Sequence, residues 1–315
     1  MAKISQTFKE IIQIVIFLAV VGLLLTTFVI YPLNRTKALA GREAIDDYDA
    51  DSLGVNDPTP FLEAGFAVDT FYIEADGVTS LACAYLTQGV DTTAPDETFV
   101  PRGTALLAHD EGHDRLSMLP LARMLVDSGF AVVVYDQRAT GLTSGEYHGD
   151  GQYEATDLAE IVPYLALRDQ LTHPFVAVGY GLGADASILA SAEESRMDAV
   201  VAIEPYLSTE RWLNVMFDRN DTFWIPFRHT VFWFWYDLRS GYAAKYRGSD
   251  QIQGLSKTTL VLAPQEALDS PEYATLAELT ASGLLTTGTR PADESALLDA
   301  VVKFAMDQLP APATE

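Results

Sequence analysis

Residues 175–190 read FVAVGYGLGADASILA, which is an apolar run, a glycine-rich turn and then a series of small residues. The apolar run has the length of a buried strand, and small residues suit a helix that packs closely against such a strand. Proteins place two kinds of site on a turn like this one: a nucleophilic serine at its apex, or a dinucleotide phosphate. The apex residue here is Gly181, which has no side chain.

Short apolar runs alternate with helical patterns on both sides of this turn. We expect strands at 104–110, 130–136, 175–180, 198–205, 258–264 and 284–288. We expect helices at 116–129, 153–169, 184–194, 271–282 and 294–309. The run 66–86 predicts a hairpin around Asp76 and Gly77. Strands that are apolar throughout predict an α/β fold with a mostly parallel sheet covered by helices on both faces.

The chain is strongly acidic: 20 Lys and Arg residues stand against 44 Asp and Glu residues, a formal net charge of −24. Such a surface repels nucleic acid, which we therefore exclude as a partner. The single cysteine, Cys83, excludes an internal disulfide framework and metal motifs built from cysteine.

The N-terminus contains an uncharged apolar run, Ile11–Tyr31. Its 21 residues would span about 32 Å as a helix, close to the thickness of a membrane core. The alternative is a cleaved signal peptide, since residues 38–41 read ALAG, but the apolar run is longer than a signal core. We expect this domain plan: tail and transmembrane helix 1–32, linker 33–64, main domain 65–310 with an insertion at 208–250, and tail 311–315.

The orientation in the membrane is not fixed by charge. Lys3 and Lys9 precede the apolar run, and Arg35, Lys37 and Arg42 follow it, so the positive-inside count is a tie when the α-amino group is included. An acidic domain avoids the anionic inner leaflet. We therefore expect a single-pass cell-membrane protein whose main domain is extracytoplasmic, on the periplasmic side in a bacterium.

Several motifs follow one another in an informative order. The segment LLAHDEGHDRLSMLPLARMLVDSGFAVVVYDQRATGLTSGEY (106–147) has a strand, loop, helix and strand pattern, and its part YDQRATGLTSGE resembles Asp-x-Arg-Gly-x-Gly-x-Ser-x-Gly. GYGLG (179–183) then stands where Gly-x-Ser-x-Gly is expected, and the insertion follows at the position of a lid. Over 66–308 the chain resembles the α/β-hydrolase family.

The resemblance implies a nucleophile elbow without its nucleophile. The elbow residues are Gly179, Tyr180, Gly181, Leu182 and Gly183, and Gly181 occupies the serine position. The family's oxyanion loop starts at His109, where Asp110 replaces the usual glycine and brings a carboxylate to the place where negative charge would develop.

The other two members of a catalytic triad are expected after the later strands. Ala267 aligns with the acid, leaving Glu266 and Asp269 as vestigial candidates. The loop expected to carry the histidine has Thr289 and Arg290, and none of the last 86 residues is a histidine. Loss of both nucleophile and general base predicts an inactive site.

We expect neither a cofactor nor a metal, although the sequence contains a motif that suggests each. Residues 179–184 also satisfy G-x-G-x-x-A, with Glu204 placed like a ribose-binding acid, but such a motif normally opens the first β-α-β unit of a fold. The segment HDEGHD (109–114) is conceivable as a metal site, although it lacks the helical H-E-x-x-H spacing. A polar loop is the simpler interpretation.

Aromatic residues concentrate in 211–236, which contains all four tryptophans. This segment either packs as a lid helix over the former pocket or docks against lipid or another membrane protein. The candidate interaction residues are Trp212, Trp224, Phe232, Trp233, Trp235 and Tyr236.

These observations predict a non-catalytic, membrane-anchored protein that serves as an accessory or structural subunit of a membrane complex. One alternative is a membrane-anchored esterase or lipase of the serine-hydrolase type that uses displaced residues. Another is a module that binds a small ligand under the lid.

Overall fold

The computed structural model places most of the main domain and the apolar N-terminal segment. It describes residues 6–25, 28, 56–77, 79–89, 99–145, 149, 151–219, 257–270, 273, 276 and 283–310. These residues belong to two compact units that divide within α7 (Thr209–Arg219). The first unit holds α1 and α7 from Glu210 onward, and the second holds the sheet and its helices.

The helix α1 (Gln6–Leu25) contains an 18-residue window, Phe8–Leu25, with a mean hydropathy of 2.3. By length and composition it can cross a membrane. It begins at Gln6 rather than at the expected Ile11, because the polar residues before the apolar run also adopt helical structure. Beyond Leu25, the expected run to Tyr31 lies outside the described residues except for Phe28.

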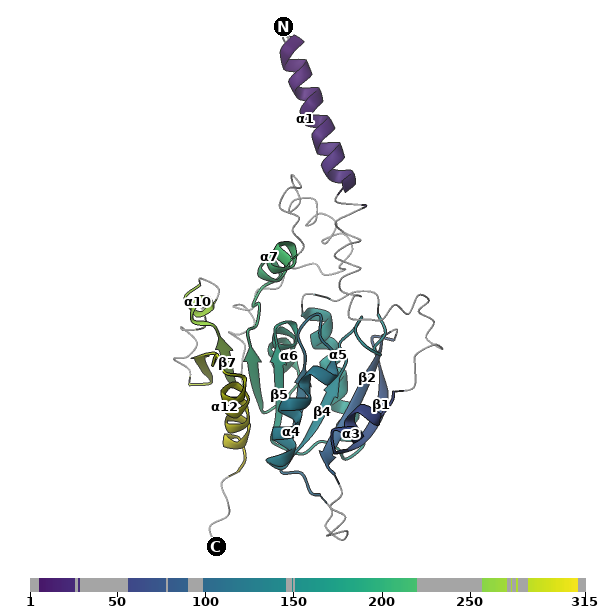
Figure 1. Ribbon diagram of the computed structural model, residues 1–315, viewed down its shortest axis with the longest axis vertical. Helices are drawn as coiled ribbons and strands as arrows, with labels where there is room; N and C mark the ends of the chain where they lie inside the picture. The colour runs from purple at the N-terminus through teal and green to yellow at the C-terminus, as the bar shows by residue number, and fades with distance from the viewer. Residues whose placement is uncertain are drawn as a thin grey trace. The chain divides into compact units, whose positions relative to one another are not determined.

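The described strands form one eight-stranded sheet in the order β1-β2-β4-β3-β5-β6-β7-β8 (Figure 1). The strands are β1 (Phe66–Ala75), β2 (Thr79–Gln88), β3 (Gly103–Ala108), β4 (Phe130–Tyr135), β5 (Phe175–Tyr180), β6 (Ala199–Ile203), β7 (Thr258–Ala263) and β8 (Leu285–Thr289). From β4 to β8 all pairings are parallel, while β1 and β2 add antiparallel strands at one edge. The expected α/β architecture is confirmed.

The leading hairpin turns where the sequence predicts. Asp76 and Gly77 have φ values of 50° and 75°, in the left-handed region that aspartate and glycine tolerate best. The Asp76 carboxylate accepts the backbone N–H of Thr79 at 3.0 Å, which closes the turn onto the start of β2.

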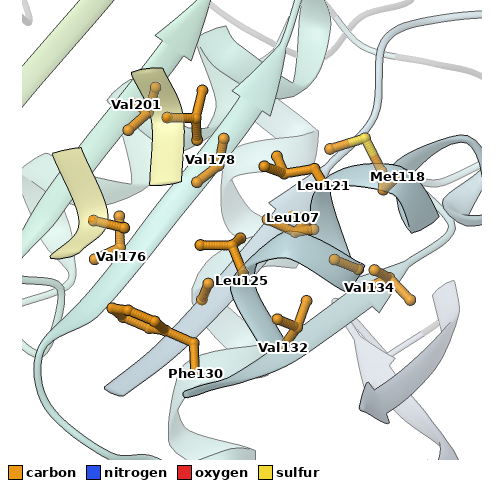
Figure 2. Close-up of a cluster of buried hydrophobic side chains, with 14 of the residues drawn as sticks. Leu107, Met118, Leu121, Leu125, Phe130, Val132, Val134, Val176, Val178 and Val201 are labelled. Atoms are coloured by element: carbon orange, nitrogen blue, oxygen red, sulfur yellow. The ribbon is translucent and has the colours of Figure 1, made fainter. Parts of the chain in front are cut away.

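Helices cover both faces of the sheet (Figure 1). The helices α4 (Leu119–Asp127) and α12 (Glu294–Asp307) pack on one face, and α5 (Gln152–Leu167) and α6 (Leu182–Glu193) on the other. Figure 2 shows Leu121 and Leu125 of α4 against Leu107, Val132 and other valines of the central strands. Since neighbouring strand residues point to opposite faces, each central strand contributes to both cores and must be apolar throughout.

The described part of the expected linker packs against the sheet. Asn56 is 7% exposed, and its Nδ2 donates to the carbonyl oxygens of Phe71 at 3.0 Å and Cys83 at 2.9 Å. Arg115 Nη1 donates to Asn56 Oδ1 at 2.6 Å, and Phe61 in the short helix α3 (Thr59–Glu63) is fully buried. Residues 56–64 therefore belong to the folded unit, although their sequence has no periodicity that indicates it.

Three further expectations concern segments near the later strands. A short helix, α10 (Gln265–Leu268), follows β7 in a stretch for which we expected neither a helix nor a strand. The expected helix 271–282 lies outside the described residues except for Tyr273 and Leu276, which are both buried. Most of the insertion 208–250, all of it after Arg219, also lies outside them.

Candidate functional site

The elbow lies between β5 and α6. Gly181 is the only residue between them, with φ 50° and ψ −113°. Its N–H donates to the carbonyl oxygen of Ile203 at 2.9 Å, and its own carbonyl accepts the N–H groups of Ala184 and Asp185. A residue with a Cβ atom would be strained in this conformation, whereas glycine adopts it without steric cost.

The neighbouring glycines allow α6 to approach the sheet closely. A Cβ atom on Gly183 would lie 2.5 Å from the carbonyl oxygens of Ala108 and His109. A Cβ atom on Gly179 would lie 2.1 Å from the carbonyl oxygen of Gly183. Packing between backbone atoms thus accounts for the glycine pattern, and no bound phosphate is needed to explain it.

The carboxylate of Asp110 fills the space beside Gly181. A Cβ atom built on Gly181 would lie only 1.8 Å from Asp110 Oδ1. The same oxygen accepts the backbone N–H of Leu182 at 3.0 Å and lies 3.4 Å from the Tyr206 hydroxyl, which donates to it. The first N–H groups of a helix have no partner within the helix, so this aspartate caps the N-terminus of α6 from a different loop.

This arrangement determines what the elbow can do. In a working elbow, the backbone N–H of the residue after the nucleophile binds the oxyanion of the tetrahedral intermediate. Leu182 is that residue, and its N–H already donates to the Asp110 carboxylate. The same contact places a negative charge where a dinucleotide phosphate would have to bind, and like charges repel.

His109 is a neutral, structural histidine. It is fully buried, and its Nε2 accepts the backbone N–H of Gln137 at 3.0 Å. Its Nδ1 must therefore carry the proton that it donates to the carbonyl oxygen of Asp110 at 2.8 Å. Burial lowers the pKa of the imidazole, which favours this uncharged form.

Asp114 and His113, two other residues of HDEGHD, differ in their surroundings. Asp114 caps a short 3₁₀ helix (Arg115–Met118) by accepting the N–H groups of Leu116 and Ser117, and His113 is exposed. Among the described residues, no group of three or more His, Cys, Asp or Glu side chains is arranged to hold a metal ion.

An uncharged pair lies at the ends of β7 and β8, next to the position expected for the triad acid (Ala267) and in the loop expected to carry the histidine. Thr289 Oγ1 donates to Gln265 Oε1 at 2.9 Å, joining the end of β8 to α10. The candidates Glu266 and Asp269 are both exposed, and Asp269 accepts a hydrogen bond from Gln265 Nε2 at 3.0 Å. In the part of the chain that the structure describes, no hydrogen bond or ion pair links either carboxylate to the elbow.

Charged groups gather beside this pair. Arg290 Nη1 lies 2.7 Å from Glu204 Oε1, and Arg290 Nη2 lies 3.6 Å from Glu294 Oε2. Glu204 has φ 53°, a strained value for a residue other than glycine, and its carboxylate pairs with arginine where the dinucleotide interpretation needed it for a ribose. Burial, followed by the charge of Glu294, raises the pKa of Tyr180 to about 12.

The structure brings some expected site residues together and leaves others apart. The five elbow residues lie at one turn, and Trp212 on α7 is 7% exposed. The other candidate interaction residues, Trp224, Phe232, Trp233, Trp235 and Tyr236, lie outside the described residues. Sequence reasoning missed Tyr206 and Gln265, although both are polar residues that directly follow the expected strands.

Comparison with known proteins was negative by sequence and positive by structure. No family model matches the chain, and no curated protein sequence matches it. It is similar to the structure of an esterase from Pyrococcus furiosus (14% identity, TM-score 0.62), over 81% of this chain and 95% of that one.

Two further solved structures are similar. They are an α/β-hydrolase from Vibrio vulnificus (13% identity, TM-score 0.56, 78% of this chain and 81% of that one) and a proline iminopeptidase from Mycobacterium smegmatis (10% identity, TM-score 0.53, 76% and 98%). At such identities the likeness concerns the fold alone. The chain has the α/β-hydrolase fold.

Proposed function

We propose that this protein is a catalytically inactive, membrane-anchored α/β-hydrolase-fold protein that serves as an accessory subunit of a membrane complex. The observation that carries the proposal is the Asp110 carboxylate, which occupies the space beside Gly181 and accepts the N–H of Leu182. The chain's own anion thus takes the position that a reacting oxyanion would need.

Ester hydrolysis at the elbow would lack both a nucleophile and a free N–H donor for the oxyanion. Gly181 offers no oxygen to attack a carbonyl carbon. A tetrahedral intermediate would meet the negative charge of Asp110 instead of a free N–H donor. Since removal of one oxyanion donor costs about 10²–10³ in kcat, an opposing charge at that donor is a strong barrier to catalysis.

A general base is also missing from the place where the fold would present one. Thr289 and Gln265 hydrogen-bond to each other and are uncharged at ordinary pH. The guanidinium of Arg290 offers no lone pair with which to accept a proton. An inactive elbow follows from both features together, because nucleophile and base act as a unit.

The membrane role rests on α1 and on the composition of the chain. The helix is long and apolar enough to cross a bilayer. We assign the main domain to the extracytoplasmic side, since its acidic surface would be repelled by anionic inner-leaflet lipids. We assign contacts with the partner to the aromatic segment 211–236, because tryptophan and tyrosine are favoured at both protein and lipid interfaces.

A fluorophosphonate probe tests whether any serine of the chain is an activated nucleophile. The full chain, purified in mild detergent, is incubated with the probe and weighed by intact-mass spectrometry. We expect no adduct, because the elbow carries no serine. The matched control is the same protein denatured before labelling, and an adduct confined to the native protein would support an esterase that uses displaced residues.

The accessory role has its own test. The tagged full chain is extracted from its native membranes in mild detergent and analysed by native mass spectrometry. We expect a fixed-stoichiometry complex in which this chain is one component, and the tagged partner should retrieve this chain in return. A chain that is always found as a lone monomer would contradict the subunit role but leave the inactive elbow untouched.

A further inference from the structure

The loop that follows β6 leads out of the unit that holds the sheet. It comprises residues 204–208, between Ile203 at the end of β6 and Thr209 at the start of α7. The boundary between the two compact units falls directly after Thr209, which is fully buried. The conformation of this loop therefore determines where the chain leaves the sheet unit and continues into the aromatic segment 211–236.

A buried carboxylate on α6 holds the middle of the loop. Asp185 is 1% exposed, and each of its two oxygens accepts one backbone N–H from the loop. Oδ2 accepts the N–H of Tyr206 at 2.9 Å, and Oδ1 accepts the N–H of Leu207 at 2.8 Å. Because these hydrogen bonds are shielded from water, the loss of either acceptor would leave a buried donor unsatisfied.

Two tyrosine hydroxyl groups add contacts to the same loop. The Tyr206 hydroxyl donates to Asp110 Oδ1 at 3.4 Å, and the Tyr273 hydroxyl donates to the carbonyl oxygen of Pro205 at 2.6 Å. Asp110 belongs to the loop after β3 and fills the space beside Gly181. The carboxylate that blocks the elbow thus also contacts the loop after β6.

The backbone of the loop is strained in its observed conformation. Glu204 and Leu207 have φ values of 53° and 64°, in the left-handed region that disfavours residues with a Cβ atom. Glu204 also precedes Pro205, and a residue before proline prefers an extended conformation. Local preference therefore opposes this conformation, and the contacts with Asp185 and Asp110 must outweigh the strain.

The first residue of the loop is tied to the sheet independently of these contacts. The Glu204 N–H donates to the carbonyl oxygen of Leu262 on β7 at 2.7 Å, and Glu204 Oε1 lies 2.7 Å from Arg290 Nη1. Rotation about the backbone bonds that follow the Glu204 nitrogen can move the rest of the loop without breaking the hydrogen bond to β7. Glu204 is therefore placed as a hinge.

We propose that residues 204–208 form a latch that two carboxylates, Asp185 and Asp110, hold closed against its backbone strain. Loss of these contacts lets the latch open about Glu204 while the sheet stays folded. The closed latch positions the start of the aromatic segment to which the proposed function assigns the partner contact, and in this respect the inference rests on that function. The former oxyanion loop and α6 then hold this junction instead of binding a reacting anion.

Hydrogen exchange measured by mass spectrometry on the full chain in mild detergent tests the latch. Asp185→Asn keeps the size of the side chain but turns one acceptor into a donor. We expect amides in the peptide 204–209 to exchange about tenfold faster or more, because a buried N–H loses a charged acceptor. Amides of β5 should keep their wild-type rates, since the opening is local.

The matched control is Asp198→Asn, which removes a carboxylate that accepts the N–H of Phe175 at 2.7 Å, at the start of β5. It should leave exchange in the peptide 204–209 unchanged. Wild-type exchange of this peptide in Asp185→Asn would overturn the proposal. So would an equal acceleration of the β5 amides in that variant, because the loop would then open only when the whole sheet unfolds.

The role of strain is tested in the Asp185→Asn background. Glu204→Gly relieves the strain at the hinge and removes the ion pair with Arg290, whereas Arg290→Gln removes the same ion pair without changing the backbone. Glycine adopts the left-handed conformation without steric cost, which favours the closed latch. We expect the loop to exchange several-fold more slowly with Glu204→Gly than with Arg290→Gln. Equal or faster exchange with glycine would overturn the hinge at Glu204.

The positioning role is tested on the complex extracted from native membranes. Native mass spectrometry should show a smaller bound fraction for Asp185→Asn than for the wild type, and an unchanged one for Asp198→Asn. An undiminished bound fraction for Asp185→Asn would overturn the positioning role. A wild-type chain that is always monomeric would instead contradict the subunit role, while the exchange rates still decide whether the latch exists.

Discussion

At the scale of single residues, the Asp110 carboxylate can take its position only because Gly181 has no side chain. The space that a side chain on residue 181 would enter is filled by the Asp110 carboxylate, which in turn is held by Leu182 and Tyr206. A serine at 181 and an aspartate at 110 therefore exclude each other in this backbone. Asp110 thus occupies the space that the side chain of a nucleophile at residue 181 would need.

Gly181→Ala measures the cost of this exclusion. We expect it to lower the free energy of unfolding by about 2 kcal/mol or more, from backbone strain and from the clash with Asp110. Gly77→Ala is the matched control: Gly77 has φ 75°, but nothing lies within 4 Å of its added Cβ atom. It should lose about 1 kcal/mol, from strain alone. Chemical unfolding of the full chain in detergent gives both values.

A double-mutant cycle separates the clash from the strain. With Asp110→Gly in the background, Gly181→Ala should cost about 1 kcal/mol less than it does in the wild type, because the carboxylate is gone. Costs that simply add would show that Asp110 does not fill the space beside Gly181.

The residues of the site differ in how far sequence predicts them. The missing serine and histidine can be read directly, because a glycine or an arginine at those positions cannot take their roles. The resemblance also placed Asp110 in the oxyanion loop. The contact of Tyr206 with Asp110 joins residues 96 positions apart, and no local pattern encodes it.

At the scale of secondary-structure elements, buried charges connect segments of the chain. Hydrophobic periodicity predicts each segment but not the contacts between them. Arg138 joins the hairpin, the β4 loop and α5, and its partner Asp157 is fully buried. Removing one partner of a buried pair leaves the other charge uncompensated, which typically costs 3–5 kcal/mol.

Arg138→Gln should therefore lower the free energy of unfolding by about 3 kcal/mol. Arg168→Gln is the matched control, because Arg168 pairs with Asp69 at the same 2.5 Å but both side chains are about 40% exposed. Solvent screening should limit its loss to about 1 kcal/mol. Equal losses in urea unfolding of the two variants would contradict a larger stabilising contribution from the buried Arg138–Asp157 ion pair.

Element boundaries show where sequence patterns stop being sufficient. The helix expected over 116–129 is a 3₁₀ turn followed by α4, which begins at Leu119 with Pro120 in its first turn. Proline is favoured in the first turn because a backbone N–H there would have no partner within the helix, so proline loses nothing by lacking one. The short helix α10 has no apolar period, so nothing in its sequence distinguishes it from a loop.

At the scale of the whole molecule, the fold was predictable because the strands of a doubly covered parallel sheet must be apolar along their length. This apolar pattern identifies the central strands, but it does not identify segments that polar contacts attach to the sheet. Asn56 is the example: its two hydrogen bonds to strand carbonyls attach residues 56–64 to the sheet, and hydrophobic patterning does not detect such contacts.

The proposed extracytoplasmic location of the main domain can be tested with a single thiol. Cys83 is fully buried and burial raises its pKa, so the wild type should resist alkylation. Ser195→Cys places a thiol at an exposed position of the main domain. A membrane-impermeant maleimide should label this variant in intact cells. Labelling only after the cells are opened would place the domain in the cytoplasm.

The central claim, that the elbow performs no acyl-transfer chemistry, is tested most directly by the rate of p-nitrophenyl butyrate hydrolysis. The full chain in mild detergent should give the rate of buffer and detergent alone, and so should Asp110→Ala, because freeing the Leu182 N–H supplies neither nucleophile nor base. Hydrolysis by the wild-type protein well above that background, and lost in Gly181→Ala, would contradict the account.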